Sequence, residues 1–180
     1  MGDFVIGMGA NLGAREATLA SAASAIDALA HVSLGALSSV YESEPLPAAG
    51  PPQPRYLNAA VRVTSELPAL ALLERLLAIE VAHGRVRTGL RWASRTLDLD
   101  ILWSDLPVSG AQLQVPHAQL TERTFALAPL LDVAPELAPA YAGRLAALGG
   151  APRRHGRLVR PAWPATGAGP DTPAVQFEPV

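Results

Sequence analysis

The order of apolar segments along the chain is the feature that most restricts its fold. Four short runs, apolar or alternating, are typical of β-strands and cover residues 3–8, 32–41, 57–65 and 96–103. Two further segments, residues 15–29 and 68–83, carry apolar side chains at the spacing of one helix face. The resulting order is β-α-β-β-α-β. It predicts an α+β, ferredoxin-like core, in which an antiparallel sheet carries its helices on one face.

Length and composition predict a single domain with a tail. A chain of 180 residues, 49% hydrophobic and 17% charged, is long enough for one packed core and short for two. A further short helix is expected over residues 122–131, and Pro, Ala, Gly and Arg dominate from residue 151 onward. We therefore expect one domain over residues 1–150 with extra C-terminal elements. The tail, residues 151–180, is expected to be poorly ordered or to lie along the surface.

Several classes of protein are disfavoured by the composition. No apolar run reaches the length that spans a bilayer, and the first residues do not resemble a secretory signal. The formal charge of −2 argues against a protein that holds nucleic acid on a basic surface. Because the chain has no cysteine, any metal must be bound by oxygen or imidazole ligands. We expect a cytoplasmic monomer that binds neither nucleic acid nor membrane.

Two long loops are predicted between these elements. Residues 42–55 contain five prolines, which exclude a regular helix or a central strand. Residues 85–94 contain Arg85, Arg87, Arg91 and Trp92. Long loops inside compact domains are often functional, and both of these run into predicted strands.

Asp98 and Asp100 are the first candidates for chemistry. Side chains at i and i+2 of a strand share one face, so the two carboxylates project together while Leu97, Leu99 and Ile101 face the core. Like charges so close repel one another unless water or a cation lies between them. Mg²⁺ is commonly bound by one or two carboxylates together with waters and substrate phosphates. An exposed polar strand face is the alternative for this spacing alone.

Arginines surround this pair in the sequence. Arg85, Arg87 and Arg91 precede it, Arg95 stands directly before the strand, and Arg123 follows. Guanidinium groups suit polyphosphate oxygens, although solvated arginines are the alternative for any one of them. The chain has neither the phosphate-binding Gly-x-x-x-x-Gly-Lys-Ser/Thr loop nor the dinucleotide fingerprint. We therefore expect side chains, and not a glycine-rich backbone loop, to bind the polyphosphate.

A set of spaced motifs gives the chain a specific resemblance. It resembles the 6-hydroxymethyl-7,8-dihydropterin pyrophosphokinases of folate biosynthesis along residues 4–137. The motifs are Ile6-Gly-Met-Gly-Ala-Asn-Leu-Gly13, Val40-Tyr-Glu-Ser-Glu-Pro45, Tyr56-Leu-Asn58, Ile79-Glu80 with Gly84-Arg-Val-Arg87, Trp92 with Arg95-Thr-Leu-Asp-Leu-Asp-Ile-Leu102, Val115-Pro-His117 and Arg123-Thr-Phe125. The resemblance implies a ferredoxin-like enzyme that transfers the pyrophosphoryl group of ATP to the hydroxymethyl group of the pterin and releases AMP.

The resemblance also implies a role for each matching residue. Asp98 and Asp100 would bind two Mg²⁺ ions, and Arg85 and Arg95 would act with them in catalysis. The implied ATP-binding residues are Glu80, Arg87, Trp92, His117 and Arg123. The implied pterin-binding residues are Tyr56 and Phe125, which would stack on the ring, Asn58, which would bind its edge, and the backbone from Ser43 to Leu46.

The chain departs from the family pattern in a few loop positions. Ala93 and Ser94 stand where Gly-Pro is common before Arg95, Ala118 follows His117 where proline or tyrosine is more typical, and the proline-rich segment is longer than expected. None of these changes removes a metal, phosphate or ring-stacking position. A catalytically silent ferredoxin-like module that binds a small ligand or nucleotide remains the alternative function, whereas RNA recognition fits poorly with carboxylates on the strand face.

Overall fold

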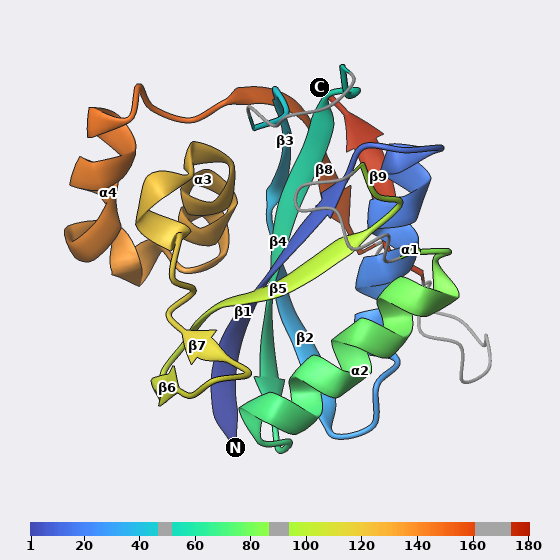
Figure 1. Ribbon diagram of the computed structural model, residues 1–180, viewed down its shortest axis with the longest axis vertical. Coiled ribbons are helices and arrows are strands. Elements are labelled where there is room, and N and C mark those ends of the chain that lie inside the picture. The colour runs from blue at the N-terminus through green and yellow to red at the C-terminus, as the bar shows by residue number, and fades with distance from the viewer. Residues whose placement is uncertain (47–51, 87–93, 161–173) are drawn as a thin grey trace, which may run out of the picture.

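A seven-stranded sheet is the centre of the molecule (Figure 1). The computed structural model describes residues 1–46, 52–86, 94–160 and 174–180. The strands lie in the order β5-β1-β4-β3-β8-β9, and β2 also pairs with β4. Their bounds are β1 (Gly2–Ala10), β2 (Val32–Leu37), β3 (Ser39–Ser43), β4 (Tyr56–Ser65), β5 (Asp98–Ser104), β8 (Arg153–Val159) and β9 (Gln176–Pro179). All of the strand pairs in this sheet are antiparallel.

The two predicted helices cover one face of this sheet, as expected. They are α1 (Arg15–Asp27) and α2 (Ala69–Ala82), and both lie on the same side of the sheet in Figure 1. Leu19 and Ile26 of α1 and Leu76 of α2 are fully buried in one apolar cluster with strand residues that include Ile6. The ferredoxin-like core predicted from the order of apolar segments is therefore confirmed.

Helix α3 (Thr124–Val133) covers the opposite face, and α4 (Ala138–Ala147) packs against α3. The chain between β5 and α3 contains β6 (Val108–Ser109), β7 (Gln114–Val115) and the 3-10 turn Leu120–Glu122, and a second 3-10 turn, Pro135–Leu137, joins α3 to α4. Leu127 and Leu130 of α3 pack against Val5, Ala60 and Leu102 of the sheet. None of the described helices is both long and apolar enough to cross a membrane.

A carboxylate at the end of α3 joins that helix to the sheet. Asp132 accepts a hydrogen bond from the Ser39 amide at 2.9 Å and is bonded to the Tyr41 hydroxyl at 3.0 and 3.1 Å. Burial of the hydroxyl and the nearby Asp132 charge both raise the pKa of Tyr41, so it stays protonated and donates. These hydrogen bonds hold the C-terminal end of α3 against β3.

Two strands differ from their predicted extents. The run predicted over residues 32–41 is two strands, β2 and β3, which separate at Ser38, where the buried hydroxyl accepts the Ala60 amide hydrogen at 2.7 Å. The first strand continues past Gly9 to Ala10. Gly7 and Gly9 therefore lie inside a paired strand, whereas the first strand was predicted to end at Met8.

The C-terminal tail was predicted to be poorly ordered or to lie along the surface, but its described part forms two ordered strands. β8 pairs with β3, and β9 pairs with β8, so both extend the main sheet. Leu158 and Val175 are 3% and 5% exposed and belong to the core beneath α1. His155 bonds Glu16 at 2.9 Å and Arg160 bonds Asp27 at 2.6 Å, so two polar contacts also reach α1. Because Pro, Ala, Gly and Arg dominate the composition of this segment, its few buried apolar residues could not be recognised from the sequence.

Replacing Leu158 with alanine tests whether β8 is part of the folding core. We expect Leu158→Ala to lower the free energy of unfolding by about 2–5 kcal/mol, because it leaves a cavity in a packed core. The matched control is Arg157→Ala on the same strand, whose exposed pair with Glu178 contributes at most about 1 kcal/mol. Urea unfolding measures both values. Equal, small losses in the two variants would mean that the strand only rests on the surface.

Candidate active site

Two glycines of β1 lie among the acidic and amide side chains of the neighbouring strands. Gly9 lies opposite Asp98 of β5 on one side and opposite Asn58 of β4 on the other, while Gly7 lies opposite Asp100 and Ala60. These positions face the α3 side of the sheet. A Cβ on Gly9 would lie 3.5 Å from the Asn58 Oδ1. Gly9 therefore leaves space between Asp98 and Asn58, within a cavity of about 280 Å³ that both residues line.

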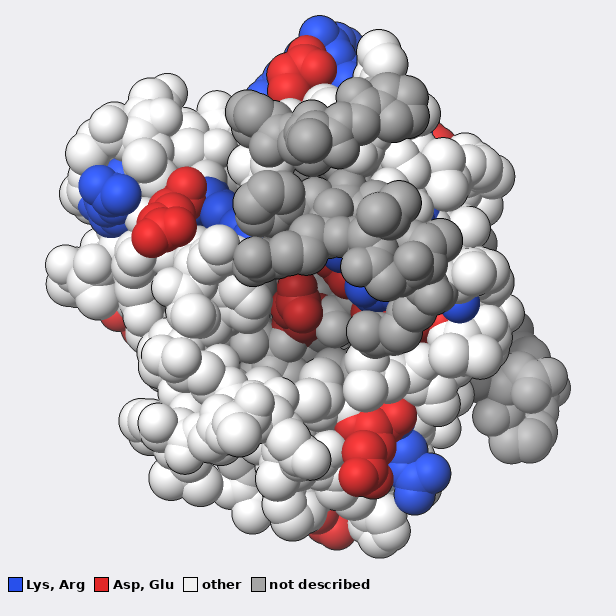
Figure 2. All heavy atoms as spheres, in the orientation of Figure 1, with Lys and Arg blue, Asp and Glu red and all other residues white. Residues whose placement is uncertain are grey.

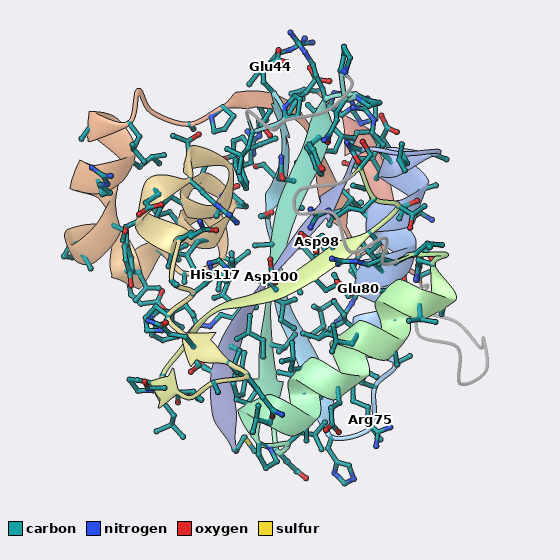
Figure 3. The ribbon with its side chains drawn as sticks, viewed as in Figure 1. Glu44, Arg75, Glu80, Asp98, Asp100 and His117 are labelled. Carbon is teal, nitrogen blue, oxygen red and sulfur yellow. The ribbon has the colours of Figure 1, made fainter. Side chains whose placement is uncertain are left out.

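Asp98 is held on its edge strand by two arginines. Arg85 donates to its Oδ1, and the Arg95 Nη1 lies 2.7 Å from its Oδ2. The same Arg85 guanidinium also bonds Glu80, whose Oε1 accepts the Leu99 amide hydrogen at 2.8 Å. Glu80 is 1% exposed, and Figure 3 shows it reaching from α2 toward β5. A buried carboxylate on the helix thus fixes the arginine that holds the first aspartate.

Asp100 has a different environment from its neighbour. Within the described part of the chain, no hydrogen-bond donor or ion-pair partner contacts its carboxylate. Burial raises the pKa of Asp100, and the nearby Asp98 charge raises it further, while His117, Arg123 and Arg85 act in the opposite direction. An ionised Asp100 therefore needs a further positive charge.

The acidic pair fits a magnesium site in its donors and in its electrostatics. Both side chains offer only oxygen ligands. The carboxylate of Asp100 also has no positively charged partner bonded to it among the described residues. The described residues contain no cluster of three or more His, Asp or Glu side chains that could hold a metal ion. Figure 2 shows acidic atoms in a hollow near the centre of the viewed face. Such a site leaves coordination positions for waters and for oxygens of a bound substrate.

Basic and polar groups of the segment before α3 form one wall of the cavity. The Nδ1 of His117 accepts the Gln119 amide hydrogen at 3.2 Å, so Nε2 is the nitrogen that can donate to a ligand. Arg123 bonds Gln119 through its guanidinium, and burial lowers the pKa of Arg123 from its usual value. In Figure 3 His117 lies on the opposite side of Asp100 from Glu80. The carboxylates thus lie between Arg85 and Glu80 on one side and His117 on the other.

An aromatic and amide slot forms the other part of the cavity. Asn58 is 6% exposed and donates from Nδ2 to the Ser43 hydroxyl at 3.0 Å, which leaves its Oδ1 as an acceptor beside Gly9. Tyr56 and Phe125 also line the cavity, the first from β4 and the second from α3. The Arg123 guanidinium lies 5.7 Å from the centre of the Phe125 ring. A flat, polar heterocycle matches two rings and one amide edge.

The structure brings most of the predicted site residues to one cavity. Its lining includes the predicted residues Ser43, Leu46, Tyr56, Asn58, Arg85, Arg95, Asp98, Asp100, His117, Arg123 and Phe125. Glu80 lies beneath the lining, buried against Arg85. Arg87 and Trp92 lie outside the described residues. These positions agree with a shared site, while the role of each residue stays a prediction.

Three lining residues were not predicted from the sequence. They are Gly9, Gln53 and Gln119, while Glu44 lies within the backbone segment predicted to bind the pterin. The i, i+2 spacing of Gly7 and Gly9 was a usable signal, because glycine inside a strand marks a close approach of another group. Gln53 lies within the proline-rich loop, where no periodic pattern indicates which side chains turn inward.

Replacing the two aspartates by asparagine should change stability in opposite directions. The raised pKa of Asp100 means that its charged form is disfavoured in the folded state. The free energy of unfolding therefore falls as pH rises from about 4, the ordinary value for Asp, through that raised pKa. We expect Asp100→Asn to gain about 0.5–2 kcal/mol at pH 7 without divalent metal. Asp98→Asn loses charge-assisted bonds from both arginines and should lose about 1–3 kcal/mol.

Urea unfolding in EDTA at pH 5 and pH 7 measures these differences. The gain of Asp100→Asn over the unsubstituted protein should be larger at pH 7. A loss of stability in Asp100→Asn at both pH values would contradict an uncompensated charge at this position.

Comparison with known proteins identifies the family of the chain. The family model described as 7,8-dihydro-6-hydroxymethylpterin-pyrophosphokinase (HPPK) matches residues 5–135. The 2-amino-4-hydroxy-6-hydroxymethyldihydropteridine pyrophosphokinase of Pseudomonas aeruginosa is 42% identical over 133 residues, which are 73% of this chain and 80% of that protein. The protein of the same name from Synechocystis is 38% identical over 141 residues, which are 78% of this chain and 70% of that protein.

A solved structure is also similar. The crystal structure of Plasmodium falciparum HPPK-DHPS matches with a TM-score of 0.49 and 15% sequence identity, over 76% of this chain and 40% of that protein. The family model covers the sheet core, the carboxylate strand and α3, and relatives near 40% identity extend along most of their own length. The chain therefore belongs to the 7,8-dihydro-6-hydroxymethylpterin-pyrophosphokinase family.

Proposed function

We propose that this chain transfers the pyrophosphoryl group of ATP to the hydroxymethyl oxygen of 6-hydroxymethyl-7,8-dihydropterin and releases AMP. The observation that carries the proposal is a single cavity with two chemically different parts. Carboxylates and arginines form one part, and two aromatic rings with a buried amide form the other. Membership of the family supports the same reaction. That the enzyme acts as a cytoplasmic monomer stays a prediction.

The carboxylate part suits a nucleotide polyphosphate with magnesium. Asp98 and Asp100 would hold two Mg²⁺ ions, because they share one face and supply only oxygen ligands. Bound magnesium supplies charge neutralisation at the phosphate oxygens. Arg85 and Arg95 already meet at Asp98, so both guanidinium groups lie beside the proposed metal site, where phosphate oxygens would bind. His117 and Arg123 lie on the far side of Asp100 and complete a cationic surround for ATP.

The aromatic part suits the pterin. Tyr56 and Phe125 would stack on the two faces of the ring, and the Oδ1 of Asn58 would accept an N–H from its edge. Backbone groups between Ser43 and Leu46 would complete the set of hydrogen bonds. Gly9 lets the hydroxymethyl group approach the carboxylate part without a side chain between them.

The reaction follows from holding the two substrates in line. The hydroxymethyl oxygen bonds to the β-phosphorus of ATP, the bond from that phosphorus to the oxygen bridging to the α-phosphate breaks, and AMP leaves. Transfer of this kind depends on positioning and on charge neutralisation more than on a strong base. Arg85 and Arg95 would stabilise negative charge during transfer. Glu80 would act indirectly, since its carboxylate fixes Arg85.

The identity of the product tests the reaction. Purified protein incubated with ATP, Mg²⁺ and the hydroxymethyl dihydropterin should form AMP and the pterin pyrophosphate in equal amounts, and EDTA should abolish the reaction. ADP as the product would indicate ordinary kinase chemistry. Bound ATP without AMP formation would favour the silent binding module.

Removing either carboxylate tests the metal assignment. Asp98→Ala and Asp100→Ala should each lower kcat by about 10³-fold or more, because several kcal/mol of charge stabilisation are lost. Circular dichroism and thermal melting establish that each variant is folded. A folded Asp98→Ala enzyme with near-normal turnover would remove Asp98 from the site.

Replacing Asn58 tests the pterin slot separately. Asn58→Leu keeps the size of the side chain and removes its hydrogen bonds, so KM for the pterin should rise about 10²-fold or more while KM for ATP changes little. Initial rates with each substrate varied in turn measure both constants. An equal rise in both values would show that Asn58 acts on the fold of the cavity and not on one substrate.

A further inference from the structure

Asn11 is a buried amide that lies outside the cavity lining and yet contacts both loops that border it. It follows β1 directly and is 1% exposed. Its side-chain Oδ1 accepts the backbone amide hydrogen of Arg95 at 2.7 Å. Its backbone N–H donates to the backbone carbonyl oxygen of Arg95 at 3.2 Å. Its Nδ2 donates to the Ser94 hydroxyl at 3.1 Å and to the Pro54 carbonyl at 3.3 Å.

The orientation of this amide follows from its partners. A backbone N–H can only donate and a backbone C=O can only accept, so Oδ1 must face Arg95 and Nδ2 must face Pro54. The side chain therefore uses its acceptor for the segment before β5 and its donor for the segment before β4. An asparagine side chain carries both groups on one planar end.

The two segments carry residues that the proposed function assigns to different substrates. The Arg95 guanidinium lies on Asp98, on the polyphosphate side. Pro54 stands two residues before Tyr56, on the pterin side. Gln53 connects Asn11 with Tyr56 a second time, because its Oε1 lies 3.4 Å from the Tyr56 hydroxyl and 3.5 Å from the Asn11 Nδ2. Asn11 thus connects a phosphate arginine with the ring that would stack on the pterin.

We propose that Asn11 is a positioning residue, which sets the distance between the ATP part and the pterin part of the cavity. This inference rests on the proposed function. In-line transfer requires the hydroxymethyl oxygen and the β-phosphorus within near-contact distance, and a displacement of about 1 Å can cost about 10²-fold in rate. Asn11 bonds the backbone of both segments, so it acts on the alignment of two substrates that it does not itself touch.

Ser94 is the second member of this link. Its hydroxyl gives the Asn11 Nδ2 an acceptor within the Arg95 segment, which neither alanine nor proline at this position could supply. The amide is therefore bonded to the Arg95 segment through both its oxygen and its nitrogen. We expect the hydroxyl to make a smaller contribution, since the backbone bonds of Asn11 remain when it is removed.

The test compares three variants in steady-state kinetics with both substrates varied. We expect Asn11→Ala to lower kcat about tenfold and to raise KM for the pterin about tenfold, and Ser94→Ala to lower kcat/KM for the pterin about threefold to tenfold. The control is Ser65→Ala at the other end of β4, where the hydroxyl accepts the Leu67 amide hydrogen at 3.0 Å. It should lower the melting temperature while KM for both substrates stays unchanged.

A purely structural role for Asn11 gives a different pattern. Loss of folded enzyme lowers the apparent kcat but leaves KM unchanged, so calorimetric binding of the pterin to folded Asn11→Ala separates the two roles. Unchanged pterin affinity and unchanged KM in Asn11→Ala would overturn the inference. If Asn11→Ala does not fold, wild-type constants in Ser94→Ala would overturn it.

The same measurements distinguish failure of this inference from failure of the proposed function. Absence of AMP formation by the unsubstituted protein rejects the proposed function and the inference with it. AMP formation by the unsubstituted protein together with unaltered kinetics in Asn11→Ala rejects the positioning role alone.

Discussion

The repulsion between Asp98 and Asp100 is the constraint on which the site depends. Two carboxylates on one face of an edge strand are stable only if positive charge lies nearby. The protein supplies it unequally: Arg85 and Arg95 bond Asp98, while Asp100 keeps a raised pKa and no donor among the described residues. Glu80 in turn fixes Arg85 from below. The negative charge of Asp100 is therefore not balanced by the described side chains. We propose that Mg²⁺, bound together with a nucleotide, balances it.

The bare backbone of β1 is what makes this charge arrangement usable. Any side chain at Gly9 would fill the space between Asp98 and Asn58, and a Cβ at Gly7 would lie 2.9 Å from the Leu102 side chain. Helix α3 covers the neighbouring part of the same face, where Val5, Ala60 and Leu102 are buried. The boundary between the packed part of the face and the hollow therefore falls within a few residues along one strand.

Some of this organisation was readable from local patterns. The order of strand and helix periods predicted the ferredoxin-like core, and strand geometry placed Asp98 and Asp100 on a common face. The C-terminal strands were missed because their apolar anchors, Leu158 and Val175, are separated by a segment with no period. Asn11 was visible only as part of a motif, since its partners lie about 40 and 80 positions away in the chain.

The sequence by itself determined the elements of the ferredoxin-like core, the acidic pair, the supply of arginines and the family, because these depend on residue type and short spacing. Tertiary structure alone decided that Asp98, and not Asp100, takes the arginines, that Glu80 lies beneath the cavity, and that one amide links its two sides. Those outcomes depend on which side chains from distant segments reach the same point. Hydrogen bonding and burial at that point are long-range properties, which no local pattern specifies.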